Sequence, residues 1–498
     1  MVTLSRRSAV RTFPTPRTSL LSRIRRAGRR TLQGAFVAVV AALMAIGAAA
    51  TGAIAQTCQP AWTTGFGGNV GNPGLGDAST AMVVFDDGSG PALYAGGYFG
   101  SAGGAAANNI AKWDGSVWSP LGSGVNNNSN NASVAALTVF DDGTGPALYA
   151  GGSFTTAGGV SASHIAKWDG SSWTPLGSGV NGDVFALTVF DDGTGPALYA
   201  GGFFTHAGGA PANYIAKWDG STWTPLGSGV TNTVIALTVF DDGSGPALYA
   251  GGTFMTAGGV SANSIAKWDG STWSPLGSGM SGFLGMSGTV RALTVFDDGS
   301  GPALYACGGF IFAGGVGVNN IAKWDGSTWS PLGSGINYER PTPLVFALTA
   351  FDDGAGPALY AGGFFTMAGG AAVNAIAKWD GSTWSPLGSG MIFLGGGNGT
   401  VFALTVFDDG TGPALFAGGG FITAGGIPAS NIARWNGCAG FAPVDLNGDG
   451  VVDGADLAAL LTQWGACPQQ GACSADLNND GVVNGADLSV LLINWGAV

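Results

Sequence analysis

The chain has 498 residues, of which 91 are glycine and only 10% are charged. Nine of its 18 basic residues but none of its 30 acids lie within residues 1–55, so the rest of the chain carries a net charge of −21. Such an acidic chain argues against nucleic acid or an anionic membrane surface as a partner, and it favours a cation such as calcium.

Residues 1–55 have the pattern of a secretory signal peptide. An arginine-rich region precedes an apolar run at residues 35–50, and the letters AIA at residues 53–55 form an A-x-A cleavage site. The run of about 16 residues is shorter than the ~20 that a membrane span needs, so we expect cleavage rather than an uncleaved anchor. The pair Arg29-Arg30 leaves general and twin-arginine export both open. The sequence therefore predicts a secreted or cell-surface protein with no membrane span after cleavage.

Seven copies of one sequence follow, at intervals of 50–56 residues. In every copy FDDG is followed by an LYAGG-like segment and by (K/R)W(D/N)G, whose Trp lies 27 residues after the first Asp of FDDG. The gap from that Trp to the next FDDG varies from 23 to 29 residues, so one loop of the repeat is free to change. A period of this length indicates a repeat architecture. The first aspartates are Asp86, Asp141, Asp191, Asp241, Asp297, Asp352 and Asp408.

Each repeat has the pattern of four short strands. In residues 184–230, VFALTVF and ALYAGGFF are strand-like and are joined by a DDGTGP turn. A Gly-rich loop, THAGGAPAN, leads to YIAKWDG and STWTPLGSG, which meet at an Asp-Gly turn. Four strands in each of seven repeats predict an all-β fold, a seven-bladed β-propeller of four-stranded blades at residues 56–438. A linear β-solenoid is the alternative, but the end caps that it needs are not visible.

The two ends of the repeat array complement each other. The last copy stops at Gly437 without its fourth strand, and a strand of that type, CQPAWTTGFGG at residues 58–68, precedes the first copy. We expect this segment to complete the last blade, with Trp62 as its second tryptophan, and so to remove two open edges. Cys58 and Cys438 would then meet and form a disulfide. Cys467 and Cys473 can pair locally, and Cys307 is expected to be a buried free thiol.

The LYAGG, WDG and xWxPL segments carry a resemblance over roughly residues 58–438. Together they resemble the kelch repeat, and they are also similar to the propeller repeats of fungal cell-polarity marker proteins. Propellers of this kind include binding proteins, scaffolds and some oxidases, so the resemblance implies the fold and leaves the function open. The Tyr, His and Cys ligand set of the copper-oxidase propellers is not visible here.

Two twelve-residue segments near the C-terminus, DLNGDGVVDGAD and DLNNDGVVNGAD, fit the calcium loop of an EF-hand. Loop positions 1, 3, 5, 7, 9 and 12 would surround one ion in each loop with the oxygen ligands that calcium prefers. A short amphipathic helix follows each loop. The predicted ligands of the two ions are Asp445, Asn447, Asp449, Val451, Asp453 and Asp456, and Asp476, Asn478, Asp480, Val482, Asn484 and Asp487.

Asp at position 12 and a spacing of about 31 residues between the two loop–helix units resemble the dockerin type I module, over residues 443–498. The resemblance implies a small helical calcium-binding module at residues 439–498 that docks onto a cohesin. The hydroxyl residues that the family uses near the end of each loop are Gly-Ala here, so attachment to the cell wall or within the chain remains an alternative. The expected core is Leu457, Leu460, Leu461, Trp464, Leu488, Leu491, Leu492 and Trp495.

Residues that break the sevenfold symmetry are the candidates for catalysis. A glycosidase needs two placed carboxylates, and nothing in the sequence brings Asp183 and Glu339 together. We therefore expect no catalytic residues. The repeated aspartates fit ordinary turn chemistry better than a calcium-binding rim. The Lys beside each WDG Trp points to the same side as the Asp two places on, which predicts an exposed ion pair within the blade. The symmetry-breaking ionisable residues are Asp77, His164, Asp183, His206, Arg291, Glu339 and Arg340.

The loops between blades vary in length at residues 126–133, 281–288, 337–343 and 392–399, and they share a face with the Gly-rich loops. Variable loops on a rigid scaffold carry binding specificity. The sequence thus predicts a secreted, non-catalytic binding or scaffold protein whose propeller binds a protein or glycan. A carbohydrate-active enzyme or carbohydrate-binding component is the alternative, which only the dockerin resemblance suggests. The loop residues of interest are Phe283, Met286, Tyr338, Arg340 and Phe393.

Overall fold

The computed structural model places the chain in two compact units. One spans Gln59–Phe441, and residues Ala442–Val498 belong to the other. The predicted signal peptide and all the cysteines except Cys307 lie outside the described residues. The structure describes residues 60–63, 75, 78–127, 131–282, 286–337, 344–410, 412–437, 446–447, 451–466, 475, 477, 482–493 and 495–497.

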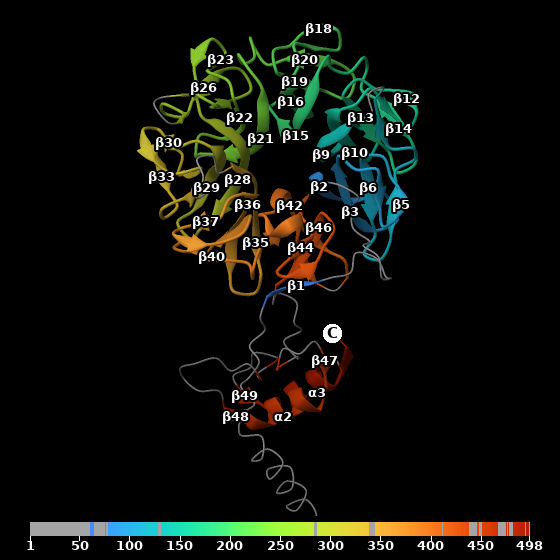
Figure 1. Ribbon diagram of the computed structural model, residues 1–498, viewed down its shortest axis with the longest axis vertical. Coiled ribbons are helices and arrows are strands. Elements are labelled where there is room, and N and C mark those ends of the chain that lie inside the picture. Colours follow the sequence, from blue (N-terminus) through green and yellow to red (C-terminus); the bar gives the residue numbers. More distant parts are fainter. Residues whose placement is uncertain are drawn as a thin grey trace, which may run out of the picture. The chain divides into compact units, whose positions relative to one another are not determined.

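The described part of the first unit forms seven antiparallel four-stranded sheets, which are arranged as blades around a central axis (Figure 1). The first strand of each blade is innermost and contacts the first strands of its neighbours. Blade 1 consists of β2 (Ser79–Asp86), β3 (Pro91–Gly97), β6 (Ile110–Trp113) and β7 (Trp118–Pro120). Blade 2 consists of β9 (Ser133–Asp141), β10 (Pro146–Ser153), β13 (Ile165–Trp168) and β14 (Trp173–Pro175). Blade 3 consists of β15 (Asp183–Asp191), β16 (Pro196–Phe203), β19 (Ile215–Trp218) and β20 (Trp223–Pro225). Blades 4 to 7 are β21 (Val234–Asp241), β22 (Pro246–Gly252), β25 (Ile265–Trp268) and β26 (Trp273–Pro275); β28 (Thr289–Asp297), β29 (Pro302–Gly309), β32 (Ile321–Trp324) and β33 (Trp329–Pro331); β35 (Leu344–Asp352), β36 (Pro357–Phe364), β39 (Ile376–Trp379) and β40 (Trp384–Pro386); β42 (Thr400–Asp408), β43 (Pro413–Gly420), β46 (Ile432–Asn436) and β1 (Ala61–Thr63). The predicted fold class is confirmed.

The second strand of each blade is apolar throughout because both of its faces are covered. In β10 every residue from Ala147 to Gly152 is buried. Close packing requires glycine at position 151, because a Cβ there would lie only 2.5 Å from Cγ1 of Val184 in the next blade. The Gly-Gly of the repeat therefore lets neighbouring blades approach closely, and each core cluster combines side chains from two adjacent blades.

The N-terminal strand closes the ring. β1 pairs antiparallel with β46 at the outer edge of blade 7, and Trp62 lies opposite Trp435. The Trp62 indole N–H donates to the carbonyl of Leu387 in blade 6, at 3.0 Å. Trp173 makes the same bond to Leu121 of its preceding blade. Trp62 is therefore the second tryptophan of blade 7, as the sequence predicts.

The Gly-rich segment is a β-hairpin and not the loop that the sequence analysis expects. In blade 2, β11 (Thr156–Ala157) and β12 (Val160–Ser161) pair around Gly158 and Gly159, whose φ angles are +58° and +83°. Two central residues with positive φ make a tight hairpin turn, which Gly-Gly permits. β8 (Val125–Asn126), from the preceding interblade segment, pairs with β11. The other small strands are β4 (Ser101–Ala102), β5 (Ala105–Ala106), β17 (His206–Ala207), β18 (Ala210–Pro211), β23 (Thr256–Ala257), β24 (Val260–Ser261), β27 (Met280–Ser281), β30 (Phe312–Ala313), β31 (Val316–Gly317), β34 (Ile336–Asn337), β37 (Met367–Ala368), β38 (Ala371–Ala372), β41 (Met391–Ile392), β44 (Thr423–Ala424) and β45 (Ile427–Pro428).

The C-terminal unit contains two similar halves. The helices are α2 (Gly454–Thr462) and α3 (Gly485–Ile493). The short strand before each helix pairs with the strand after the other helix: β47 (Val451–Val452) with β50 (Gly496–Ala497), and β48 (Gly465–Ala466) with β49 (Val482–Val483). Buried Val452, Leu460, Ala475, Val483 and Leu491 form the centre of the core.

Four residues that the sequence analysis assigns to this core are exposed instead. Leu461, Trp464, Leu492 and Trp495 have exposed fractions of 45%, 49%, 51% and 48%. The reason is the size of the module, in which a nine-residue helix buries only one face. In α2 that face holds Asp456 and Leu460, four residues apart, which leaves Leu461 on the outside.

Candidate functional site

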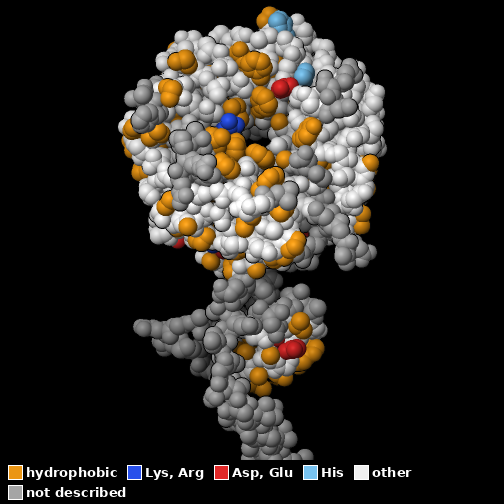
Figure 2. Space-filling view, in the orientation of Figure 1, with side chains coloured by type: hydrophobic (Ala, Val, Ile, Leu, Met, Phe, Trp, Pro, Cys, Tyr) orange, Lys and Arg blue, Asp and Glu red, His pale blue; other side chains and the backbone are white. Residues whose placement is uncertain are grey.

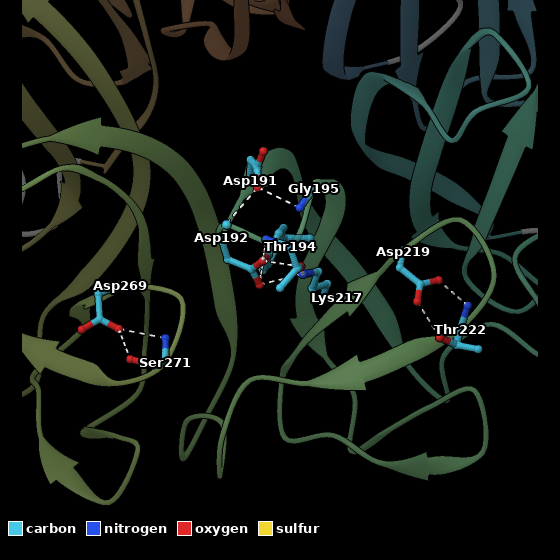
Figure 3. Close-up of polar contacts among 11 residues, drawn as sticks. Asp191, Asp192, Thr194, Gly195, Lys217, Asp219, Thr222, Asp269 and Ser271 are labelled. Atoms are coloured by element: carbon cyan, nitrogen blue, oxygen red, sulfur yellow. Dashed lines mark hydrogen bonds and ion pairs between the residues drawn. The ribbon is translucent and has the colours of Figure 1, made fainter.

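The paired aspartates of the FDDG turns bind backbone and side-chain donors of their own blade (Figure 3). In blade 3, Asp191 Oδ1 accepts the backbone N–H groups of Gly193 and Gly195, at 2.9 and 3.0 Å. Asp192 Oδ1 accepts the N–H and the hydroxyl of Thr194, at 3.2 and 2.6 Å. The first aspartate therefore shapes the turn, as the turn interpretation expects.

The second aspartate also holds the lysine of the KWDG motif. Asp192 Oδ2 accepts the Tyr199 hydroxyl at 2.8 Å and the Lys217 ammonium at 2.6 Å. The side chains of the ion pair are only 13% and 10% exposed. Burial opposes ionisation of Asp192, but the hydrogen bonds from Lys217, Thr194 and Tyr199 outweigh it and lower the pKa of the carboxyl group. The lysine pairs within its own blade, as predicted, but its partner is the second aspartate of the FDDG turn and not the WDG aspartate two residues after it, and the pair is not exposed.

The aspartate of each WDG motif closes a turn, and the glycine of that turn packs against the preceding repeat. Asp219 Oδ1 accepts the backbone N–H groups of Ser221 and Thr222, at 2.8 and 2.7 Å (Figure 3). A Cβ on Gly220 would lie 3.2 Å from the carbonyl oxygen of Asp142, in the FDDG turn of the preceding blade. The FDDG and WDG turns therefore lie on one face of the propeller, which we call the acidic-turn face.

Two symmetry-breaking residues meet on the opposite, variable-loop face. His164 Nδ1 lies 3.4 Å from Asp183 Oδ1, across the boundary between blades 2 and 3. His206 instead contacts Thr205 and Asn181, at 3.1 and 3.4 Å from its Nδ1. Among the described residues, no three His, Cys, Asp or Glu side chains are grouped as metal ligands. The predicted candidates Asp77, Glu339 and Arg340 lie outside the described residues.

Of the five variable-loop residues of interest, the structure describes two. Met286 is 63% exposed, and Phe393, which directly precedes the short 3-10 helix η2 (Leu394–Gly396), is 47% exposed. Both side chains are thus accessible to a ligand. Phe283, Tyr338 and Arg340 lie outside the described part of the chain.

The innermost strand of every blade carries a β-bulge, which the sequence analysis missed. In β28 the pairing with β29 shifts between Val290 and Ala292, so Arg291 has no partner residue across the strand pair. A bulge re-aims the side chain of its extra residue. The bulge residues of the seven blades, which we call the bulge ring, are Thr80, Ala135, Phe185, Ile235, Arg291, Phe346 and Phe402.

Side chains of the bulge ring contact one another between blades 5, 6 and 7. The Arg291 guanidinium lies over the Phe346 ring, 4.9 Å from its centroid. The Phe346 and Phe402 ring centroids are 5.1 Å apart in an edge-to-face arrangement. Figure 2 shows hydrophobic side chains and a basic group beside the hollow at the centre of the propeller. The bulge ring therefore forms an aromatic and aliphatic collar that contains one cation.

Cys307 replaces the first glycine of the Gly-Gly pair in blade 5. Its side chain is fully buried, and its Sγ lies 3.6 Å from the carbonyl oxygen of Val345 in blade 6. Burial raises the pKa of the thiol, which keeps it protonated and unreactive at neutral pH. The prediction of a buried free thiol is confirmed. The predicted disulfides involve cysteines outside the described residues and stay predictions.

In the C-terminal unit, the last position of each predicted calcium loop is a buried carboxylate. Asp456 accepts the backbone N–H groups of Asn447 and Asp453, at 3.1 and 2.8 Å. Asp487 accepts those of Leu477 and Asn484, both at 2.7 Å. Each of these two carboxylates is 0% exposed and ties the beginning of its loop to the end.

The position 9 residues begin the helices. Asp453 Oδ1 accepts the Ala455 N–H at 2.7 Å, and Asn484 Oδ1 accepts the Ala486 N–H at 2.8 Å. These caps place the loop ends at the helix N-termini. Of the other predicted ligands, Asn447, Val451 and Val482 are within the described residues, whereas Asp445, Asp449, Asp476, Asn478 and Asp480 lie outside them.

The donor set of this unit fits calcium. Residues 439–498 contain seven aspartates and no Lys, Arg or His. A buried carboxylate without a compensating charge is costly, and two of these aspartates are fully buried. A divalent cation bound by carboxylate, amide and backbone oxygens would supply the missing positive charge.

Two family models match the chain. Residues 119–332 match the Rax2 C-terminal beta propeller domain, and residues 443–494 match the Dockerin type I domain. The chain thus contains a β-propeller domain followed by a dockerin type I domain, which confirms the predicted resemblance of both regions. No curated protein matches the sequence.

Similar solved structures include the extracellular domains of a one component system and of a hybrid two component system from B. thetaiotaomicron. They are 12% and 10% identical to this chain, with TM-scores of 0.45 and 0.46. The matches cover 73% and 76% of this chain but only 39% of each of those chains. Separately, no helix within the described residues is both long and apolar enough to cross a membrane.

Proposed function

We propose that this is a secreted, non-catalytic binding protein. After removal of a signal peptide at residues 1–55, a propeller at residues 56–438 binds a protein or glycan on its variable-loop face, and a dockerin-type module at residues 439–498 attaches it to a partner. The observation that carries this proposal is that the repeated aspartates accept hydrogen bonds from groups within their own blades, as Asp191 and Asp192 do. These carboxylates stabilise the fold and are not placed as a catalytic pair.

Two calcium ions hold the module in shape in this proposal. The first ion binds to the loop that ends at Asp456, and the second to the loop that ends at Asp487. The seven aspartates of the module and its lack of any basic residue support a requirement for metal. The ligands are the twelve residues that the two loop motifs indicate.

The module docks through an apolar surface, which we define as Leu461, Trp464, Leu492 and Trp495. All four side chains are exposed, and each residue of the first half has its counterpart in the second half. Exposed tryptophans are frequent anchors in protein interfaces. Because the loop ends carry Gly-Ala where hydroxyl contacts are expected, we propose that these apolar side chains supply the affinity for a cohesin-like partner.

A carbohydrate-active enzyme or carbohydrate-binding component remains the second candidate. The dockerin type I match is the specific observation that favours it. Hydrolysis of a polysaccharide by the purified full chain, lost on Glu339→Gln, would establish this candidate and overturn the non-catalytic proposal.

The docking proposal can be tested with an immobilised type I cohesin domain. We expect the full chain to bind in calcium and to be released by EDTA. Because the two halves are similar, Trp464→Ser combined with Trp495→Ser should abolish binding, whereas either change alone should weaken it by less. Met286→Ser, which removes an exposed apolar side chain from the propeller, is the matched control and should bind normally. Failure of the unaltered chain to bind any cohesin would favour attachment to the cell wall or within the chain.

A further inference from the structure

We propose that the bulge ring is a binding site for a small carboxylic acid with an apolar body, and that Arg291 receives the carboxylate. This inference rests on the proposed non-catalytic binding function, and it adds a small-molecule site in the central hollow to the protein or glycan site proposed on the variable-loop face. The ligand would enter the central hollow, which Figure 2 shows. It would place its apolar part against the aromatic side chains of the ring, such as Phe346, which the Arg291 guanidinium contacts.

The first argument is the variation among the seven copies. The residue after the bulge is Ala in every blade, and the residue before it is Val in six of the seven. Between these near-constant neighbours, the bulge residue is Thr, Ala, Phe, Ile, Arg, Phe and Phe in blades 1 to 7. A position that served the fold alone would repeat like its neighbours. Its variation instead builds an asymmetric surface inside a symmetric scaffold.

The second argument is the state of Arg291. Arg291 is only partly buried, but its Nε is fully buried without a hydrogen-bond partner. Burial lowers the pKa of the guanidinium group. The other described Lys and Arg side chains each form an ion pair with an aspartate, but Arg291 forms none among the described residues. An incoming carboxylate would accept hydrogen bonds from the terminal nitrogens of the guanidinium group and offset the cost of partly burying its charge.

The third argument concerns the rest of the ligand. Beside Arg291, the bulge ring offers aromatic and aliphatic side chains and a single hydroxyl, on Thr80, which already donates to the Val134 carbonyl at 2.6 Å. A sugar buried there would leave most of its hydroxyl groups unpaired, which is costly. An aryl or alkyl group would instead lose only its contact with water. The collar therefore favours an apolar body over a glycan.

The charge distribution agrees with an anionic ligand. Of the 23 acids in the propeller, 20 belong to the FDDG and WDG turns. These turns are on the acidic-turn face, whereas the bulges lie near the other end of the innermost strands, toward the variable loops. An anion that enters from the variable-loop face therefore meets little like charge.

The test is calorimetric titration of the full chain, in calcium, with phenylacetate and with octanoate. Acetate, which lacks the apolar body, and 2-phenylethanol, which lacks the charge, are the comparison ligands. We expect one site per chain for phenylacetate or octanoate, and affinity at least about tenfold lower for both comparison ligands.

Two matched variants assign the site. Arg291→Ile introduces the residue that blade 4 has at the same position, so the variant should fold, and it should lower the affinity at least about tenfold. Arg434→Lys gives blade 7 the lysine of the other six blades, on the acidic-turn face, and should leave the affinity unchanged. The melting temperature of each variant checks its folding.

Three results would overturn the inference: no binding of either apolar acid, equal binding of 2-phenylethanol and phenylacetate, or full affinity in Arg291→Ile. None of these results depends on the dockerin module, so the attachment proposal would stand. Conversely, loss of cohesin binding in the Trp464→Ser, Trp495→Ser variant would leave the titration with phenylacetate unaffected. The two proposals therefore fail separately.

Discussion

At the scale of single residues, the second aspartate of each FDDG turn connects three elements of its blade. Its carboxylate joins the turn, the tyrosine of the second strand and the lysine of the third strand. Blade 7 varies this arrangement, with Phe416 in place of tyrosine and Arg434 in place of lysine. Arg434 still binds Asp409, at 2.6 Å. The ion pair is thus kept where the hydroxyl is lost.

This role predicts unequal effects for two adjacent and chemically identical changes. Asp192→Asn should lower the free energy of unfolding by about 2–3 kcal/mol, because the buried Lys217 ammonium loses its counter-ion. Asp191→Asn should change it by less than about 0.5 kcal/mol, because an amide oxygen still accepts the backbone N–H groups of the exposed turn. Urea unfolding of both variants checks this difference, and equal effects would contradict it.

The same carboxylates predict how stability depends on pH. Burial opposes ionisation of Asp142, but hydrogen bonds from Lys167, Thr144 and Tyr149 lower the pKa of its carboxyl group to about 2. An unfolded aspartate titrates near 3.9, so this stabilisation is complete above about pH 5 and is lost as the pH falls toward 2. Burial and Asp142 raise the pKa of Tyr149, so its contribution is present below about pH 10 and is lost above it.

We therefore expect the free energy of unfolding to be nearly constant between about pH 5 and pH 9 and to fall on both sides. Denaturant titrations across this range measure it. In Asp142→Asn the acid slope should be shallower than in the unaltered chain, since one such group has been removed. If the free energy of unfolding of Asp142→Asn falls with pH as steeply as that of the unaltered chain, other groups cause the acid unfolding.

At the scale of elements, closure of the ring depends on β1, which is not joined to its neighbouring strand β46 by a short turn. β20 follows β19 directly, whereas β1 reaches β46 from the other end of the repeat array. Trp62 fixes β1 by packing against Trp435, with ring centroids 5.2 Å apart. A loosened β1 would expose the edge of blade 7.

Trp62→Ala should therefore open blade 7. We expect the free energy of unfolding to fall by about 3–5 kcal/mol and the backbone amides of β46 to exchange faster. Trp223→Ala removes the equivalent indole from blade 3, where the hairpin keeps β20 beside β19, and is the matched control. Hydrogen exchange measured by mass spectrometry should show a larger increase in β46 for the first variant than in β19 for the second. The measurement is made with disulfides reduced, because a Cys58–Cys438 bond would itself attach β1 to blade 7; equal increases would then show that covalent connection does not matter.

At the scale of the whole molecule, the two units should respond differently to removal of metal. The module has a small core and seven aspartates, so without calcium its carboxylates repel one another and it should unfold. The propeller has its own core clusters in each pair of blades. Calorimetry of the full chain should show a small transition that EDTA abolishes and a large one that EDTA leaves in place.

Titration with calcium should count two ions per chain, and the double variant Asp445→Ala, Asp476→Ala should bind none. The single variant Asp445→Ala, which leaves the second loop complete, is the control and should still bind one. A small transition with the same melting temperature in calcium and in EDTA would contradict the calcium-site prediction.

The repeat pattern predicted those features that depend on residues near one another in sequence. Four strands per copy follow from alternation and turn residues, and the role of Trp62 follows from the missing fourth strand of the last copy. The Gly-Gly hairpins were missed, although Gly158-Gly159 between short strand-like segments was a usable signal. The exposure of Leu461 was missed because helical periodicity alone does not show which apolar face finds a partner.

The sequence by itself determined the propeller, its closure by the N-terminal strand and the two calcium-loop motifs, because each of them follows from a short sequence pattern that repeats along the chain. Only the tertiary structure decided that the KWDG lysine pairs with an aspartate 25 positions earlier in the chain, as Lys217 does with Asp192. Only the structure, likewise, placed Arg291 and Phe346 in one ring. A β-bulge leaves no separate mark in the alternation of a single strand, and contacts between blades arise only when the strands are paired and the ring is closed.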